Sequence, residues 1–111
     1  MNSIMIHGKI IADAKMVLLK NEVKEERPMV IFEVSDSGMP YQKKEALSIE
    51  VHFQEEAAMH IYRYLKKDKE VIVQGFLKER KFLRGGQEIK RHFISAKLVM
   101  FTPLKKDMQN G

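Results

Sequence analysis

Residues 47–77 read LSIEVHFQEEAAMHIYRYLKKDKEVIVQGFL, and this stretch decides the fold. The odd-numbered residues from Leu47 to Phe53 are apolar and alternate with polar ones, which is the pattern of a strand with one buried face. Residues 54–67 then carry apolar side chains at helical spacing, with Glu in the first turn and Lys in the last, an order that suits the helix dipole. Alternation returns over residues 71–77. The stretch therefore predicts a strand, a helix and another strand.

The flanking sequence predicts further strands. Before this stretch, residues 4–11 and 16–19 are rich in apolar side chains and are separated by Ala12-Asp13-Ala14, and residues 30–35 alternate. After it, Gly85-Gly86 lies between two strand-like runs, residues 78–83 and 88–94, and reads as the turn of a hairpin. Residues 96–101 close the pattern. The predicted order is three strands, a helix and two long strands.

This order is that of the OB-fold, a small Greek-key barrel. We predict an all-β chain that forms a five-stranded OB-fold barrel, with one helix between the third and fourth strands and a long hairpin made by the last two. Gly8 and Gly75 stand inside predicted strands, where a glycine often marks a sharp bend. Phe32 and Phe53 fall on apolar faces and are expected in the core. Residues 1–104 are expected to form the OB-fold domain, and residues 105–111 a short polar tail.

Composition narrows the class of protein. The chain has 111 residues, with 44% hydrophobic and 32% charged side chains, as in a soluble globular domain. It has no cysteine, which excludes disulfides and thiolate chemistry and fits a reducing compartment. No apolar run approaches the roughly 20 residues that span a bilayer. We therefore expect a cytoplasmic protein without membrane contact.

The charge is unevenly distributed along the chain. Residues 1–75 hold 11 Lys and Arg against 12 Asp and Glu, whereas residues 76–111 hold 9 against 3. The net charge of +5 therefore comes from the last third. A concentrated positive field is the usual footprint of a polyanionic partner, although a solvated basic surface has the same composition.

Binding of single-stranded nucleic acid needs cations for the phosphates and flat side chains for the bases. Residues 78–91 supply both. For Phe82 we favour base stacking over core packing, and for Phe93 core packing over stacking. The candidate nucleic-acid-binding residues are Tyr41, Lys43, Lys44, Lys78, Arg80, Lys81, Phe82, Arg84, Lys90 and Arg91.

Catalytic chemistry has little support in the sequence. The four histidines show no metal-ligand spacing, and no nucleotide-binding or nucleophile motif is present. A nuclease built on an OB barrel would need convergent acidic and basic groups, which the pattern does not show. We predict no enzyme activity, no cofactor and no metal.

Several segments resemble bacterial single-stranded DNA-binding proteins (SSB). Residues 2–10, NSIMIHGKI, resemble the N-K-V-x-L-x-G-x-L opening of that family, and residues 71–77, VIVQGFL, resemble its V-Y-V-E-G-R-L strand. With Phe32–Ser35, Val51–Lys67 and Lys78–Phe82, the resemblance covers residues 2–101. It implies sequence-tolerant binding of single-stranded DNA in replication, recombination or repair. It also implies a homodimer or homotetramer in which the first strand pairs subunits, through Ile4, Met5, Ile6 and His7.

The chain departs from that family in two respects. It has no tryptophan, so Phe82 stands at one stacking position, Ser48 at another, and Tyr41 near a third. The family's long acidic tail does not follow the domain. A tailless OB chain also resembles primosomal replication protein N, so the alternative is a primosome or recombination accessory whose OB surface mainly contacts proteins. A phage, plasmid or mobile-element variant of SSB fits the same pattern. Possible partners then include replication or primosome proteins. The candidate stacking and phosphate-binding residues would suit DNA and RNA equally. The sequence also leaves open whether the oligomer is a dimer or a tetramer.

Overall fold

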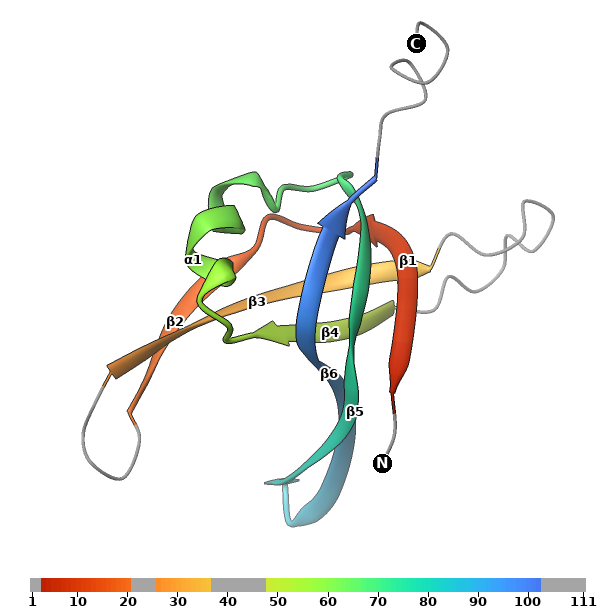
Figure 1. The fold of residues 1–111 in the computed structure, drawn as a ribbon. Coiled ribbons are helices and arrows are strands. Elements are labelled where there is room, and N and C mark those ends of the chain that lie inside the picture. The colour runs from red at the N-terminus through yellow and green to blue at the C-terminus, as the bar shows by residue number, and fades with distance from the viewer. Residues whose placement is uncertain (1–2, 21–25, 37–47, 103–111) are drawn as a thin grey trace, which may run out of the picture.

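The computed structural model describes residues 3–20, 26–36 and 48–102 (Figure 1). The elements in these residues are, in chain order, β1 (Ile4–Ile10), β2 (Lys15–Lys20), β3 (Glu26–Asp36), β4 (Ser48–Phe53), α1 (Ala57–Ile61), the 3-10 helix η1 (Tyr62–Tyr64), β5 (Glu70–Arg84) and β6 (Gln87–Phe101). No helix in the described ranges is long and apolar enough to cross a membrane.

The strands form a closed ring. Their order is β1-β5-β6-β4-β3-β2, and β1 pairs with β3 as well, which closes the sheet on itself. All pairs are antiparallel except β4 with β6, which is parallel. In Figure 1, α1 lies at one end of the ring and the β5–β6 hairpin extends from the other. The mostly-β, OB-fold-like architecture is as predicted.

The number of strand segments differs from the prediction of five. Residues 11–14, which include the predicted break at Ala12-Asp13-Ala14, separate β1 from β2 as two elements, so the described residues form six strands. Polar contacts explain the break. Ala14 donates its amide hydrogen to the Leu65 carbonyl at 2.9 Å, and the Lys67 amide donates to Asp13 Oδ1 at 2.9 Å. The corner is therefore bonded to the segment after the helix at Asp13 and Ala14, while Ile11 donates its amide hydrogen to the Glu33 carbonyl of β3 at 3.1 Å.

The helix is shorter than the predicted range of 54–67. Helix α1 covers only Ala57–Ile61, and the chain then tightens into η1. Glu55 and Glu56 precede the helix instead of forming its first turn. Leu65 explains the early end, because its side chain is fully buried and its amide bonds back to the Tyr62 carbonyl at 3.1 Å.

The core fills the inside of the ring. Alternate residues of each strand point inward, and Phe32 and Phe53 are buried as predicted, at 3% and 2% exposure. The other buried apolar residues are Ile10, Ala14, Met29, Val30, Val34, Val51, Ala58, Leu65, Val71, Val73, Ile94, Ala96 and Val99.

Two glycines allow backbones to approach each other where the sheet bends. A Cβ atom at Gly8 would lie 2.2 Å from the Ser35 carbonyl oxygen, and one at Gly75 would lie 2.1 Å from the Ser95 carbonyl oxygen. Gly8 pairs with β5 on one side and with β3 on the other, and Gly75 marks an irregularity in the β5–β6 register. Neither position has room for a side chain, which accounts for glycine at both predicted bends.

The hairpin turns on Gly85 and Gly86, as predicted. Their φ angles are +60° and +82°, values that favour glycine and suit a two-residue hairpin turn. The turn fixes the register of the arms, with Arg84 opposite Gln87 and Phe82 opposite Ile89.

Candidate nucleic-acid interface

The β5–β6 hairpin has two chemically different faces. Successive strand residues point to opposite sides, and directly paired residues share a side. One side, which we call the cationic face, is made by Lys78, Arg80, Phe82 and Arg84 of β5 and by Gln87, Ile89, Arg91 and Phe93 of β6. The other, which we call the balanced face, carries Glu79, Lys81 and Leu83 of β5 and Glu88, Lys90 and His92 of β6.

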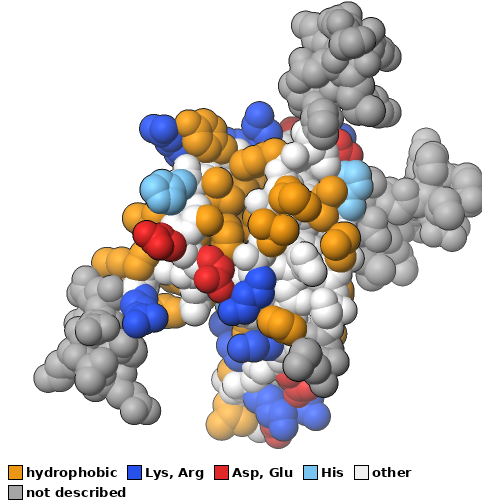
Figure 2. Space-filling view, viewed as in Figure 1, with side chains coloured by type: hydrophobic (Ala, Val, Ile, Leu, Met, Phe, Trp, Pro, Cys, Tyr) orange, Lys and Arg blue, Asp and Glu red, His pale blue; other side chains and the backbone are white. Residues whose placement is uncertain are grey.

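The positive charge of the hairpin is concentrated on the cationic face. That face has four cations and no carboxylate, whereas the balanced face has two lysines and two glutamates. On the balanced face, Lys81 Nζ lies 3.9 Å from Glu88 Oε1, and His92 Nε2 lies 3.7 Å from Glu79 Oε2. In Figure 2, Lys and Arg side chains gather along the hairpin in the lower part of the view. Charge alone therefore favours one side of the hairpin for an anionic ligand.

Phe82 lies at the centre of the cationic face. The guanidinium carbons of Arg80 and Arg91 lie 5.8 Å and 5.7 Å from the centroid of its ring. Its side chain is half-buried and does not belong to the buried core. An aromatic ring beside two arginines on an exposed hairpin offers a stacking surface and phosphate ligands close together.

Phe93 occupies the root of the same face. The predicted core position of Phe93 is wrong, because the buried residue of this part of β6 is Ile94, and Phe93 points to the other side. Its ring stacks on His52 of β4, with the centroids 4.2 Å apart and the planes 22° apart. His52 is 7% exposed whereas Phe93 is half-buried, so Phe93 covers His52.

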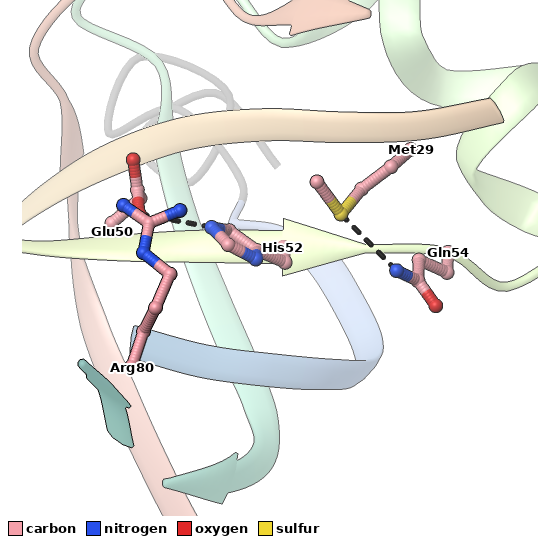
Figure 3. Close-up of polar contacts among 5 residues, drawn as sticks. All are labelled: Met29, Glu50, His52, Gln54 and Arg80. Carbon is pink, nitrogen blue, oxygen red and sulfur yellow. Dashed lines mark hydrogen bonds and ion pairs between the residues drawn. The ribbon is translucent and has the colours of Figure 1, made fainter. Parts of the chain in front are cut away.

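Glu50 joins the ring to the hairpin. Its Oε2 accepts a hydrogen bond from His52 Nε2 at 2.9 Å and lies 3.9 Å from Arg80 Nη2. Figure 3 shows His52 and Arg80 converging on this carboxylate. Farther along the same strand, Gln54 donates to the Met29 sulfur at 3.1 Å, which ties the end of β4 to β3 (Figure 3). Glu50 therefore holds Arg80 close to the Phe93 and His52 rings.

Two hollows open beside this network. One has a volume of about 190 Å³ and is lined by Glu33, Ser48, Ile49, Glu50, Arg91 and His92. The other has a volume of about 250 Å³ and is lined by Ala12, Asp13, Lys15, Ile31, Phe32, Glu33 and Glu50. Both run along the outer side of β3 and β4. The cationic face thus leads onto a hollowed, polar surface of the ring.

The structure separates the predicted binding residues into three groups. Lys78, Arg80, Phe82, Arg84 and Arg91 share the cationic face. Lys81 and Lys90 lie on the balanced face, so the structure does not bring them together with the others. The remaining three, Tyr41, Lys43 and Lys44, lie outside the described residues.

Sequence reasoning missed Glu50, His52 and Phe93 as parts of this surface. The signal for Phe93 was available, because a two-residue turn at Gly85-Gly86 fixes which residues of the arms share a side. No local signal indicates that Glu50 neighbours Phe93, because β4 and β6 pair in parallel across more than 40 residues of sequence.

The first strand presents only half of its predicted interface residues to the outside. Met5 is 63% exposed and His7 is exposed, whereas Ile4 and Ile6 are half-buried against the core. Strand β5 covers one edge of β1 from Ile4 to Lys9, but β3 pairs only with Gly8–Ile10. Among the described residues, the other edge of residues 4–7 therefore has no strand partner.

An apolar surface adjoins this edge. Met5, Leu98 and Met100 are exposed on the outer side of β1 and β6, and Ile72 lies between them on β5. Figure 2 shows hydrophobic side chains gathered over these strands. This surface lies away from the tip of the hairpin.

Metal-binding geometry is absent from the described ranges, where three or more His, Asp or Glu side chains do not converge on one point. His7 contacts Glu70, with Nε2 and Oε1 3.5 Å apart, on the exposed side of β1 and β5.

Two solved structures share this fold. A Plasmodium falciparum SSB, in a structure described as its complex with ssDNA, is 20% identical with a TM-score of 0.73, and the match covers 93% of this chain and 96% of that one. A small single-stranded DNA-binding protein from Streptomyces coelicolor is 20% identical with a TM-score of 0.68, and the match covers 91% of this chain and 94% of that one. No curated protein matches the chain.

The sequence itself matches a family along almost all of its length. The match spans residues 1–102, which includes every described strand, the hairpin and the cationic face. By this match, the chain belongs to the single-strand binding protein family.

Proposed function

We propose that this chain binds single-stranded DNA on the cationic face of the β5–β6 hairpin and on the adjoining outer surface of β4. The observation that carries the proposal is the position of Phe82 beside the paired residues Arg80 and Arg91, on a hairpin face with four cations and no carboxylate of its own. Membership of the family and the Plasmodium falciparum SSB structure in complex with ssDNA support it.

The binding mechanism follows from the chemistry of that face. The arginines and Lys78 take phosphates and release condensed counterions, while bases stack on Phe82 and Phe93. None of these contacts reads a base pair, so binding is tolerant of sequence and requires unpaired bases. A surface this rich in cations suits nucleic acid better than a protein partner. We infer a role in DNA replication, recombination or repair as a binding protein without catalysis, in the cytoplasm.

The two faces of the hairpin supply a matched test. Arg80→Ala/Arg91→Ala and Lys81→Ala/Lys90→Ala remove the same charge from opposite sides of the hairpin. Fluorescence anisotropy with a labelled oligo-dT strand should show a loss of at least tenfold for the first pair and a small loss for the second. Wild-type protein should bind a duplex of the same length more weakly. Equal losses for both pairs would show that only overall charge matters and would overturn the assignment of the face.

We also propose that the chain forms a homodimer or homotetramer through β1. The open edge of residues 4–7 can pair with the same strand of a second copy, and the apolar surface around Met5 can be covered at the same time. This arrangement leaves the cationic face of each copy free for DNA.

We propose that residues 1–104 are sufficient for binding. The last described strand, β6, ends at Phe101, and all assigned contacts of the cationic face come before it. A chain that ends at residue 104 should bind oligo-dT as the full chain does. A loss of affinity above threefold would show that the polar tail, residues 105–111, takes part.

A further inference from the structure

Phe93 lies between two opposite charges. On one side its pairing partner is Glu50 of β4, and on the other side it is Lys78 of β5. Because neighbouring strands lie about 4.8 Å apart, both charged groups are within reach of a base stacked on the Phe93 ring. His52 occupies one side of that ring, so a base stacks on the side turned away from His52.

Glu50 stays in place when DNA binds. Its contact with Arg80 is long, at 3.9 Å, and both side chains are substantially exposed, at 52% and 38%. Such an ion pair is weak and gives way easily to a phosphate. The hydrogen bond from His52 is 2.9 Å long and comes from a side chain that is only 9% exposed. When Arg80 turns to a phosphate, His52 therefore continues to hold the carboxylate beside Phe93.

One oxygen of Glu50 remains available as an acceptor. Within the part of the chain that the structure describes, both contacts of the carboxylate fall on Oε2. A carboxylate offers about four acceptor sites and no donor. Oε1 therefore presents acceptor sites to a ligand group that carries hydrogen-bond donors.

This chemistry distinguishes one pyrimidine from the other. Cytosine carries the N4 amino group, a donor that a Glu side chain accepts, whereas thymine and uracil carry a carbonyl oxygen at the same position. A carbonyl facing a carboxylate brings two acceptors together. Lys78, on the far side of Phe93, can bond the O2 carbonyl that all three bases share or an adjacent phosphate.

We propose that Glu50 makes the Phe93 subsite selective for a base with an exocyclic amino group, cytosine over thymine or uracil. The inference rests on the proposed binding of single-stranded DNA and deepens it. The protein thus tolerates sequence along the hairpin and has a preference at one subsite on the ring.

The test compares oligo-dC with oligo-dU of equal length, because these strands differ only at the edge that Glu50 would read. The proteins are the wild type, Glu50→Gln and Glu88→Gln. The last is a matched control, since it removes the same charge from the balanced face, where Glu88 pairs with Lys81. Fluorescence anisotropy gives the ratio of the two affinities for each protein.

The wild type should prefer dC to dU by about three- to tenfold. Glu50→Gln should bring the ratio close to one, chiefly by tightening dU, because an amide can donate as well as accept. Glu88→Gln should leave the wild-type ratio unchanged. If Glu50→Gln changes the affinities for dC and dU by the same factor, Glu50 acts only through its charge and the selectivity is refuted.

A second variant tests the stacking surface itself, and its melting temperature checks that the structure around His52 is intact. Phe93→Leu keeps an apolar side chain over His52 but removes the flat surface for the base. It should lower the ratio of dC to dU affinity while the melting temperature of Glu50→Gln and of Phe93→Leu stays within a few degrees of the wild type. An unchanged ratio in Phe93→Leu places the preference elsewhere and refutes the subsite. A wild type that binds neither oligonucleotide would instead refute the proposed function itself.

Discussion

Arg80 and Arg91 lie directly opposite each other across the β5–β6 hairpin, although both are positively charged. Like charges at paired positions destabilise a sheet. The ring of Phe82 offsets part of this cost, because both guanidinium groups lie within 6 Å of its centroid. An arrangement that is unfavourable in the free protein would become favourable if, as proposed, a phosphate binds at the two arginines.

Arg91→Gln should therefore separate stability from binding. Removing one of the two like charges should leave the free energy of unfolding unchanged or raise it by up to about 1 kcal/mol. The affinity for oligo-dT should fall. Chemical denaturation and fluorescence anisotropy on the same variant provide the two readings. A variant that is destabilised yet binds normally would contradict the assignment of Arg91 to the interface.

The salt dependence of binding should come from the cationic face. The slope of log K against log[salt] is about −0.7 per phosphate neutralised on a single strand. Replacing Arg80 and Arg91 together by Ala should flatten the slope by about 1.4, which corresponds to two phosphates. Replacing Lys81 and Lys90 should change it far less. An equal change in both double variants would mean that the strand contacts both sides of the hairpin.

Phe82 should act as a stacking surface and contribute little to folding. Phe82→Ala should weaken oligo-dT binding by about 1–3 kcal/mol with a small change in melting temperature, because the side chain lies outside the buried core. Phe82→Trp should tighten binding. Phe53→Ala is the contrast, since Phe53 is fully buried and its loss should cost about 3–5 kcal/mol of folding stability. A lower melting temperature with unchanged affinity in Phe82→Ala would refute the stacking role.

Gly75→Ala should destabilise the ring. The added Cβ would lie 2.1 Å from the Ser95 carbonyl oxygen, so the backbone of β5 or β6 must move, at a cost of about 1–3 kcal/mol or more. Gly85→Asn is the control, because nothing lies near a Cβ there and Asn tolerates a φ of +60°. Thermal unfolding compares the two. Similar melting temperatures would show that the β5–β6 register relaxes without cost.

Met5→Glu should weaken self-association. Met5 is exposed beside the open edge of β1, and a carboxylate there would be buried in the proposed interface. Light scattering at micromolar concentration should show an oligomer for the wild type and a smaller species for the variant. His60→Glu, on the exposed surface of α1, is the control and should behave as the wild type. A monomeric wild type would exclude the proposed oligomer.

The sequence alone was enough to predict those elements whose pattern lies within one continuous segment. Alternation predicted the strands, and the register of the hairpin follows from the two glycines at its turn. Its errors have causes that lie in the tertiary structure. The helix ends where Leu65 is buried in the core and bonds back to Tyr62, and the bonds that fix the corner before β2 run from Asp13 and Ala14 to the residues after the helix. Neither requirement is visible within the segments themselves.

The residues of the binding surface are determined partly by the local sequence and partly by the tertiary structure. Sequence determined that cations and Phe82 occur together in residues 78–91, because that is a property of one continuous segment. Only the tertiary structure decided that Lys81 and Lys90 point away from that surface, to the side that carries Glu79 and Glu88, since side-chain direction follows from pairing. Only the closure of the ring brings Glu50 and His52 beside Phe93. A parallel contact between β4 and β6 joins residues more than 40 positions apart, and no pattern within either strand encodes its partner.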